Sequence, residues 1–212
     1  NHPLVHLDAA LRPIGTHTTV GGTSLRSPFS VHALSDGRLV VSDTRTGVHI
    51  IDPSASGLGA ATTILSATDG RTSAAVVPRE IAVTDDDTIV VHDRSNGRGR
   101  RLVRIAANGE PRGEPIPLDG LVTDIAVTAW GDAIAANATT RSLDVIHLDA
   151  ESSAAGDPIS RYRIGSLGRI YAATDELRTL QGRTITLGEI SDPDRIAPTS
   201  VAVDRSTREI VI

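Results

Sequence analysis

The sequence predicts an all-β fold, a β-propeller of five blades, built from one repeated unit of two short strands joined by a turn. The clearest copy is Pro78–Asp93, where Ile81, Val83, Ile89 and Val91 alternate with smaller or polar residues. This two-residue period is typical of a half-buried strand, and the acidic residues between the two halves favour a turn. The spacing of the copies and the match between the two chain ends complete the prediction.

The copies align by the first apolar residue of the leading strand. These anchor residues are Val31, Ile81, Ile125, Ile170 and Val201. Their spacings are 50, 44, 45 and 31 residues, so the fourth repeat is expected to be truncated. Periods of about 40 to 50 residues with several strands each indicate a β-propeller, whose blades are four-stranded sheets around a central channel.

The two ends of the chain together supply one further repeat of ordinary size. From Val201 to the last residue and on from the first residue to Val31 is 42 residues. We expect Leu4–Leu7 to pair antiparallel with residues 209–212 and close the ring, because unpaired edge strands would expose their backbone donors and acceptors. The same strands exchanged between identical molecules would instead build a homo-oligomer or a polymer.

Runs of β-branched residues bounded by Gly, Pro, Asn and Asp predict the individual strands. The predicted blades lie near 27–70, 77–119, 121–164, 166–196, and 197–212 together with 1–22, all within one domain. The predicted strands lie near 4–8, 13–20, 29–35, 38–43, 47–52, 61–66, 79–84, 88–93, 101–106, 113–118, 121–127, 133–137, 142–149, 159–164, 170–174, 177–181, 183–187, 197–204 and 209–212. Residues 53–60 are expected to form a loop of small residues, and no amphipathic helix is predicted.

The unit Pro-x-x-Ile-Ala-Val-x-(turn)-Ile-Val-Val-x-Asp resembles the repeats of NHL-type and related bacterial β-propellers. The resemblance covers most of the chain and is clearest around the anchors Val31, Ile81, Ile125 and Val201. In such repeats the second strand often ends in Asp or Asn before the next turn. Three repeats have this residue: Asp43, Asp93 and Asn137. The superfamily is functionally mixed, so the resemblance implies a fold rather than an activity.

Composition excludes some partners and suggests a location. The chain has 39% hydrophobic but only 2% aromatic residues and a net charge of −5, which argues against nucleic-acid binding. One local basic run is expected to be a solvated turn, with an anion or partner patch as the alternative: Arg94, Arg98, Arg100, Arg101 and Arg104. No apolar run is long enough for a membrane span. The chain starts at Asn1 and has no Met, which is compatible with an exported mature bacterial domain, extracellular or in the cell envelope.

Residues that precede the anchors are expected to line the channel of a propeller. The candidate ligand-binding residues are Ser30, Glu80, Asp124, Arg169 and Ser200. Two of them, Glu80 and Asp124, could bind Ca²⁺ through carboxylate oxygens, or could pair with Arg169 as a salt bridge. Asn137 begins an Asn-Ala-Thr sequence and is a candidate N-glycosylation site. The acidic run Asp85–Asp87 is expected to be a solvated turn.

Three functions stay open at this point, and the sequence favours the first. It is a non-catalytic binding, interaction or structural module that presents its loops or channel mouth to a protein or small molecule. The second is a metal-dependent hydrolase that resembles calcium-dependent propeller lactonases, with Glu80 and Asp124 as ligands. The resemblance is incomplete, because those enzymes gather several acidic and amide ligands from different blades. The third is a structural subunit that assembles by strand exchange. We predict no catalytic residue, and no cofactor other than the candidate Ca²⁺.

Overall fold

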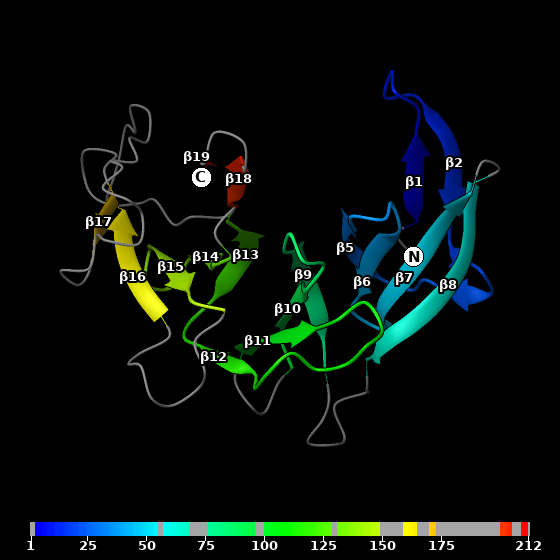
Figure 1. Cartoon of the computed structure of the whole chain (residues 1–212). Coiled ribbons are helices and arrows are strands. Elements are labelled where there is room, and N and C mark those ends of the chain that lie inside the picture. The colour runs from blue at the N-terminus through cyan, green and yellow to red at the C-terminus, as the bar shows by residue number, and fades with distance from the viewer. Residues whose placement is uncertain are drawn as a thin grey trace. The chain divides into compact units, whose positions relative to one another are not determined.

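The computed structural model is an all-β protein of antiparallel sheets (Figure 1). It describes residues 3–54, 57–67, 76–95, 100–128, 131–148, 159–164, 170–172, 200–204 and 209–211. The chain divides into two compact units, Asn1–Pro117 and Leu118–Ile212. Within the described ranges there is no helix long and apolar enough to cross a membrane.

The first unit contains the first two predicted blades as four-stranded sheets. The first sheet consists of β5 (Pro28–Ala33), β6 (Leu39–Asp43), β7 (Gly47–Ser54) and β8 (Gly57–Ser66), in that order. The second consists of β9 (Pro78–Val83), β10 (Ile89–Asp93), β11 (Arg100–Ile105) and β12 (Ile116–Leu118), again in chain order. This up-and-down order confirms the hairpins read from the alternation of apolar residues.

The loop predicted over residues 53–60 was too long, because strands occupy most of this range. Strand β7 continues to Ser54 and β8 starts at Gly57, with Pro53 opposite Leu58. The register shifts between Ile51 and Pro53. A bulge at this point is where a strand tolerates proline, which has no N–H to donate to the ladder.

Two short hairpins precede the first sheet. They are β1 (Leu4–Leu7) with β2 (Pro13–His17), and β3 (Thr19–Val20) with β4 (Thr23–Ser24). In the described ladders β1 pairs with β2 alone, with Val5 opposite Thr16. The predicted ladder between β1 and residues 209–212 is therefore not among the described strand pairs.

The second unit contains a five-stranded and a two-stranded sheet. The larger one consists of β13 (Val122–Val127), β14 (Ala133–Asn137), β15 (Ser142–Ile146), β16 (Ile159–Ile164) and β17 (Ile170–Ala172). The smaller one pairs β18 (Ala202–Asp204) with β19 (Glu209–Val211), as the last repeat predicts.

The anchor at Ile170 was assigned to the wrong strand position. Ile170 lies opposite Ile164, so β17 extends the outer edge of the third sheet instead of opening a fourth one. A short apolar strand can pair with any free edge, and its sequence does not specify which. The remaining strands predicted near 177–181 and 183–187 lie outside the described residues.

Three repeats share one inner hairpin with the same register. Val31 lies opposite Val41, Ile81 opposite Val91, and Ile125 opposite Ala135. Each five-residue turn is closed by a backbone bond: Leu34 N–H to Arg38 O (2.8 Å), Thr84 N–H to Thr88 O (3.0 Å), and Thr128 N–H to Asp132 O (2.8 Å). The repeat deduced from the sequence is therefore a repeat of backbone geometry.

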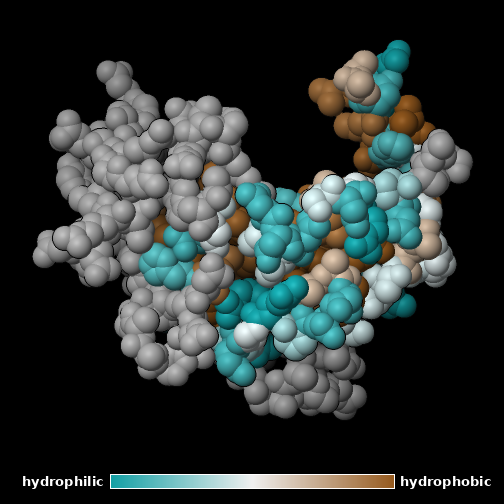
Figure 2. Space-filling model, viewed as in Figure 1, coloured by the Kyte–Doolittle hydropathy of each residue, from teal (hydrophilic) through white to brown (hydrophobic). Residues whose placement is uncertain are grey.

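Successive sheets of the first unit pack face to face on aliphatic side chains. The cluster between them contains Leu34, Val40, Val48, Ile50, Ile81, Val83, Ile89, Val91 and Ile105. Burial of each such side chain contributes about 1.5–3 kcal/mol. On its other face, the first sheet is partly covered by Val20 and Leu25 from the region of the β3–β4 hairpin. Figure 2 shows apolar surface on the β1–β2 hairpin. In this segment Leu11 is 77% exposed and Ile14 is 59% exposed.

Candidate binding site beside strands β5 and β9

Glu80, a predicted channel residue, forms a buried pair with a histidine of the next strand. Its Oε2 lies 2.5 Å from Nδ1 of His92, and the two residues are 5% and 0% exposed. A carboxylate can only accept, so Nδ1–H donates this hydrogen bond and Nε2 is the remaining ring nitrogen. Nε2 is buried and has no hydrogen-bond partner among the described residues.

The aligned positions in the neighbouring repeats have small residues. Ser42 occupies the place of His92 in the first repeat, and Ala136 occupies it in the third. Ser42 accepts a hydrogen bond from the N–H of Ser30 (3.1 Å) and donates one to the carbonyl of Arg79, so it joins the first sheet to the second. The Glu80–His92 pair is thus a feature of one repeat and not a requirement of the blade.

Arg79 lies next to Glu80 and stacks on the only phenylalanine of the chain. Its guanidinium carbon is 4.1 Å from the ring centroid of Phe29 on β5. Its Nε is 3.7 Å from Glu80 Oε1, an ion-pair distance that is too long for a hydrogen bond. The Arg79 side chain is 30% exposed and Phe29 is 46% exposed. The two residues form an accessible cation–π pair, hereafter the Arg79–Phe29 pair.

The second unit brings two further predicted residues together. Asp124 Oδ2 accepts hydrogen bonds from Ser200 Oγ (2.6 Å) and from the N–H of Val201 (3.0 Å). Asp124 Oδ1 accepts the N–H of Ile125 at 2.9 Å. The carboxylate therefore ties β13 to the segment that leads into β18, 76 residues further along the chain.

The predicted calcium ligands lie in different units, Glu80 in the first and Asp124 in the second. Each carboxylate already has protein partners. Among the residues that the structure describes, no group of three or more His, Cys, Asp or Glu side chains is placed to hold a metal ion. The calcium pair stays a prediction, and Arg169, its alternative partner, lies outside the described ranges.

The Asp or Asn at the end of each second strand is a buried structural centre, hereafter the Asp/Asn clamp (Asp43, Asp93 and Asn137). Asp43 is 0% exposed and accepts four backbone N–H groups, those of Arg26 (2.7 Å), Ser27 (2.8 Å), Arg45 (2.8 Å) and Thr46 (3.0 Å). It thereby fixes the segment before β5 to the turn after β6.

Asp93 repeats this arrangement in the second sheet. It accepts the N–H of Val77 (2.8 Å) before β9 and the N–H of Ser95 (3.0 Å) after β10. Its other oxygen accepts Nε of Arg101 at 2.8 Å. This ion pair accounts for one arginine of the local basic run. A second, Arg104, donates to the carbonyl of Glu114 (3.2 Å), so part of the run is structural.

Asn137 completes the clamp in the third sheet, and its geometry disfavours glycosylation. Its side chain is 0% exposed. Both amide hydrogens are in use, since Nδ2 donates to the carbonyl of Asp119 (2.8 Å) and to the carboxylate of Asp144 (2.9 Å). A glycan on Nδ2 would remove a donor from this buried network, and the glycosylation of Asn137 stays a prediction.

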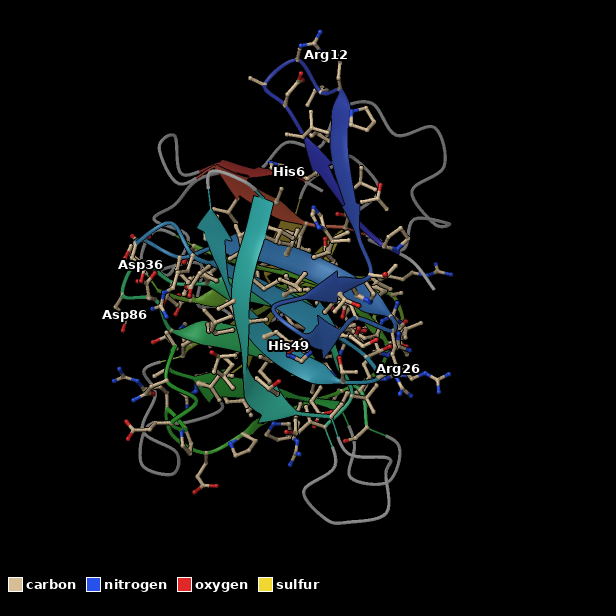
Figure 3. The ribbon with its side chains drawn as sticks, turned by 90° about the vertical axis from the view of Figure 1, so that its right-hand side faces the viewer. His6, Arg12, Arg26, Asp36, His49 and Asp86 are labelled. Atoms are coloured by element: carbon tan, nitrogen blue, oxygen red, sulfur yellow. The ribbon has the colours of Figure 1, made fainter. Side chains whose placement is uncertain are left out.

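His49 is a buried neutral group in the first sheet (labelled in Figure 3). Its two ring nitrogens lie 2.8 Å from Thr46 Oγ1 and 3.0 Å from Thr63 Oγ1. Burial lowers the pKa of His49, and the nearby negative charge of Asp43 opposes this shift. The neutral ring therefore bridges β7 to β8 and to the preceding turn.

The acidic turn Asp85–Asp87 contacts the preceding sheet. The carboxylate of Asp87 accepts the N–H of Ser35 (2.8 Å) and its Oγ–H (2.5 Å). Asp87 has a φ of 60°, in the left-handed region, where the aligned residues of the first and third repeats are Gly37 (φ 85°) and Gly131 (φ 91°). An aspartate here accepts backbone strain that glycine avoids, which indicates that the bond to Ser35 has structural value.

Replacement of Asp87 by Gly is expected to lower the free energy of unfolding by about 1 kcal/mol. Loss of two charge-assisted hydrogen bonds outweighs the relief of about 1 kcal/mol of left-handed strain. Urea unfolding followed by circular dichroism measures the difference. Asp87→Asn, which tolerates the same φ and keeps one acceptor, should fall between the two proteins. A glycine variant that is more stable than the parent would show that strain dominates.

Comparisons with known proteins identify the class of fold. No family model matches the sequence, and no curated protein matches it. Among solved structures, virginiamycin B lyase from Staphylococcus aureus is similar with a TM-score of 0.56 and 12% identity, over 94% of this chain and 67% of that one. A streptogramin B lyase matches with a TM-score of 0.52 and 12% identity, over 95% and 66%. A Bacteroides caccae protein of unknown function matches with a TM-score of 0.50 and 14% identity, over 91% and 72%.

These neighbours have β-propeller-like folds, so the predicted fold class is confirmed at that level. The chain spans about two thirds of the length of the two lyases. Their similarity at 12% identity supports a shared fold and no shared activity.

Sequence reasoning missed four residues of this site, namely Phe29, Ser42, Arg79 and His92. A signal for two of them was present. Phe29 and Arg79 each precede their anchor by two residues, so alignment of the repeats places them at equivalent positions on β5 and β9. The stacking could be expected once these strands are taken as neighbours.

Proposed function

We propose that the chain is a non-catalytic β-propeller module of the NHL-related type, which binds a protein or small-molecule ligand at its channel mouth or loops. One observation carries this proposal: the carboxylates of the predicted channel positions bond to the protein itself. Glu80 bonds to His92, and Asp124 bonds to Ser200 and Val201. Carboxylates engaged in this way stabilise a scaffold and are poorly placed to coordinate a catalytic metal.

The proposed propeller is a closed ring of five blades, one of them shared by residues 197–212 and 1–22. The exposure of the anchors supports closure. Ile81 is 1% exposed and Ile125 is 3% exposed, whereas Val31 is 49% exposed. Val31 is the anchor of the first sheet, and in the described ranges no sheet packs on its face in the way that the first sheet covers Ile81. A blade formed by β18, β19, β1 and β2 would cover it.

Self-assembly by strand exchange is a second candidate function that the same observation favours. If β19 of one molecule paired with β1 of another, the exposed face of the first sheet would be covered between molecules. Light scattering after size-exclusion chromatography distinguishes the two cases, because exchange predicts a mass that rises with concentration and closure within one chain predicts a constant mass.

A calcium titration tests the non-catalytic assignment, and the expected result is no change in the melting temperature. A calcium site with a Kd of about 0.1 mM would add about 1.4 kcal/mol of stability at about 1 mM calcium. That gain would raise the melting temperature by about 3–6 °C. Magnesium at the same concentration controls for ionic strength.

Calcium stabilisation that disappears in both Glu80→Gln and Asp124→Asn would contradict the proposal and favour the lactonase-type hydrolase. These two variants keep the size of each side chain and remove its charge. The lyase names of the structural neighbours do not bear on this choice, because the similarity extends to the fold alone.

A further inference from the structure

We propose that the Arg79–Phe29 pair is a receptor for the carboxylate group of a ligand with an apolar body. This inference rests on the proposed binding function and names the chemical class of the ligand. The pair belongs wholly to the first unit, on the neighbouring strands β5 and β9.

The guanidinium of Arg79 is held in place while its donors stay available. The guanidinium carbon of Arg79 lies over the Phe29 ring, 4.1 Å from its centroid, and this cation–π contact needs none of the N–H donors. The contact with Glu80 at 3.7 Å is an ion pair at Nε. In the described part of the chain no hydrogen bond engages the terminal nitrogens of Arg79. A fixed, partly exposed guanidinium edge fits the two oxygens of a carboxylate.

Glu80 does not cancel this positive site. Its Oε2 lies 2.5 Å from the His92 ring, much closer than its Oε1 lies to Arg79. The buried carboxylate is therefore hydrogen-bonded to the imidazole, and its ion pair with the arginine is at Nε and not at the terminal nitrogens.

An apolar surface lies beside the charged group. Phe29 and Val31, both on β5, are 46% and 49% exposed, and the register shift between Pro28 and Ser30 places Phe29 in a bulge, outside the regular alternation of the strand. Closure of the ring would cover Val31, the anchor, and would leave Phe29 with Arg79. The ring of Phe29 then packs on the body of the ligand while Arg79 binds its carboxylate.

The blade itself does not require this pair. The aligned position in the third repeat is Thr123, whose Oγ1 donates to the carbonyl of Ala136 in its own sheet. Thus one repeat fills the position with a small residue that bonds locally. The two adjacent repeats of the first unit instead place the only phenylalanine of the chain against an arginine.

The test uses the single phenylalanine as a reporter, since its ring gives the only phenylalanine signals in a proton NMR spectrum of the whole chain. Benzoate is the probe and uncharged benzamide is the matched control ligand. Benzoate should shift the Phe29 ring signals saturably with a Kd on the order of 1 mM. Arg79→Gln should raise this Kd at least about tenfold. Arg79→Lys keeps the charge but loses the paired N–H donors of the guanidinium, and should raise the Kd about threefold.

Equal binding of benzoate by Arg79→Gln, or equal shifts with benzamide, would overturn the proposal. Shifts with inorganic phosphate and none with benzoate would overturn the carboxylate assignment. If Arg79→Gln is unfolded, the Arg79→Lys comparison decides alone. If benzoate does not bind and calcium leaves the melting temperature unchanged, the carboxylate receptor is rejected and the proposed binding function is not. If calcium stabilises the protein, the proposed function is rejected whatever the benzoate result.

Discussion

Replacement of Asp43 by Ala is expected to lower the free energy of unfolding by about 3–5 kcal/mol, enough to unfold a marginal domain. The substitution leaves four backbone N–H groups without their acceptor, around a side chain that is 0% exposed. Each unsatisfied buried donor costs about 1 kcal/mol or more. Equilibrium unfolding in urea measures the loss, with fluorescence of the single Trp and circular dichroism as independent probes.

An exchange of side chains within the clamp provides the matched control. Asp43 is the acceptor in all four of these hydrogen bonds. Asp43→Asn would therefore turn an amide N–H₂ toward backbone N–H groups and should lower the free energy of unfolding by about 2–3 kcal/mol. Asn137 donates to the carbonyl of Asp119 and the carboxylate of Asp144, so Asn137→Asp would turn a negative charge toward two acceptors. Both near-isosteric variants should be destabilised. If either has the stability of the parent, hydrogen bonding at the clamp is not the cause.

A cysteine pair at residues 6 and 211 is expected to form a disulfide readily, because the proposed ring closure would pair β19 with β1. In the first sheet Val40 lies opposite Ile50, and the match of EIVI and LVHL with RLVV and VHII gives Val211 and His6 the same relation. The chain has no cysteine, so His6→Cys with Val211→Cys introduces the only thiols. Non-reducing electrophoresis then shows an internal cross-link if one chain closes on itself and a dimer if strands are exchanged.

The control pair shifts the register by one residue. His6→Cys with Ile210→Cys directs the two thiols to opposite faces of the sheet and should cross-link poorly. Deletion of residues 1–8 should in addition lower the melting temperature sharply or cause aggregation. Equal cross-linking in both pairs, or a truncated protein as stable and monomeric as the full chain, would contradict closure.

Local pattern was sufficient to predict the hairpins of the first three repeats. Alternation around Val31, Ile81 and Ile125 placed their strands to within about two residues, because a two-residue period and a turn determine a hairpin without reference to distant parts of the chain. The same reasoning failed at Ile170, whose strand pairs with β16. Which free edge a three-residue strand joins depends on tertiary packing that the pattern does not contain.

Candidate site residues were predicted by position and not by partner. Alignment selected Glu80, Asp124 and Ser200, and the structure shows that Asp124 bonds to Ser200. The alignment did not indicate that Glu80 would form a hydrogen bond with His92, because that contact depends on the side-chain geometry of two adjacent strands. The sequence showed only that an Asp or Asn recurs at the position of Asp43. Its hydrogen-bond partners are backbone N–H groups, and these leave no pattern in the sequence.

The clamp also bears on the order in which the chain acquires its structure. Asp43 bonds to residues 16 and 17 positions before it, Asp93 to one 16 positions before, and Asn137 to one 18 positions before. Each clamp therefore closes a loop of nearly constant, short length, and the entropy lost on closing such a loop is small and equal in every repeat. Contacts of low sequence separation form early. Each inner hairpin can thus form before any two sheets associate, and the proposed joining of the chain ends would come last.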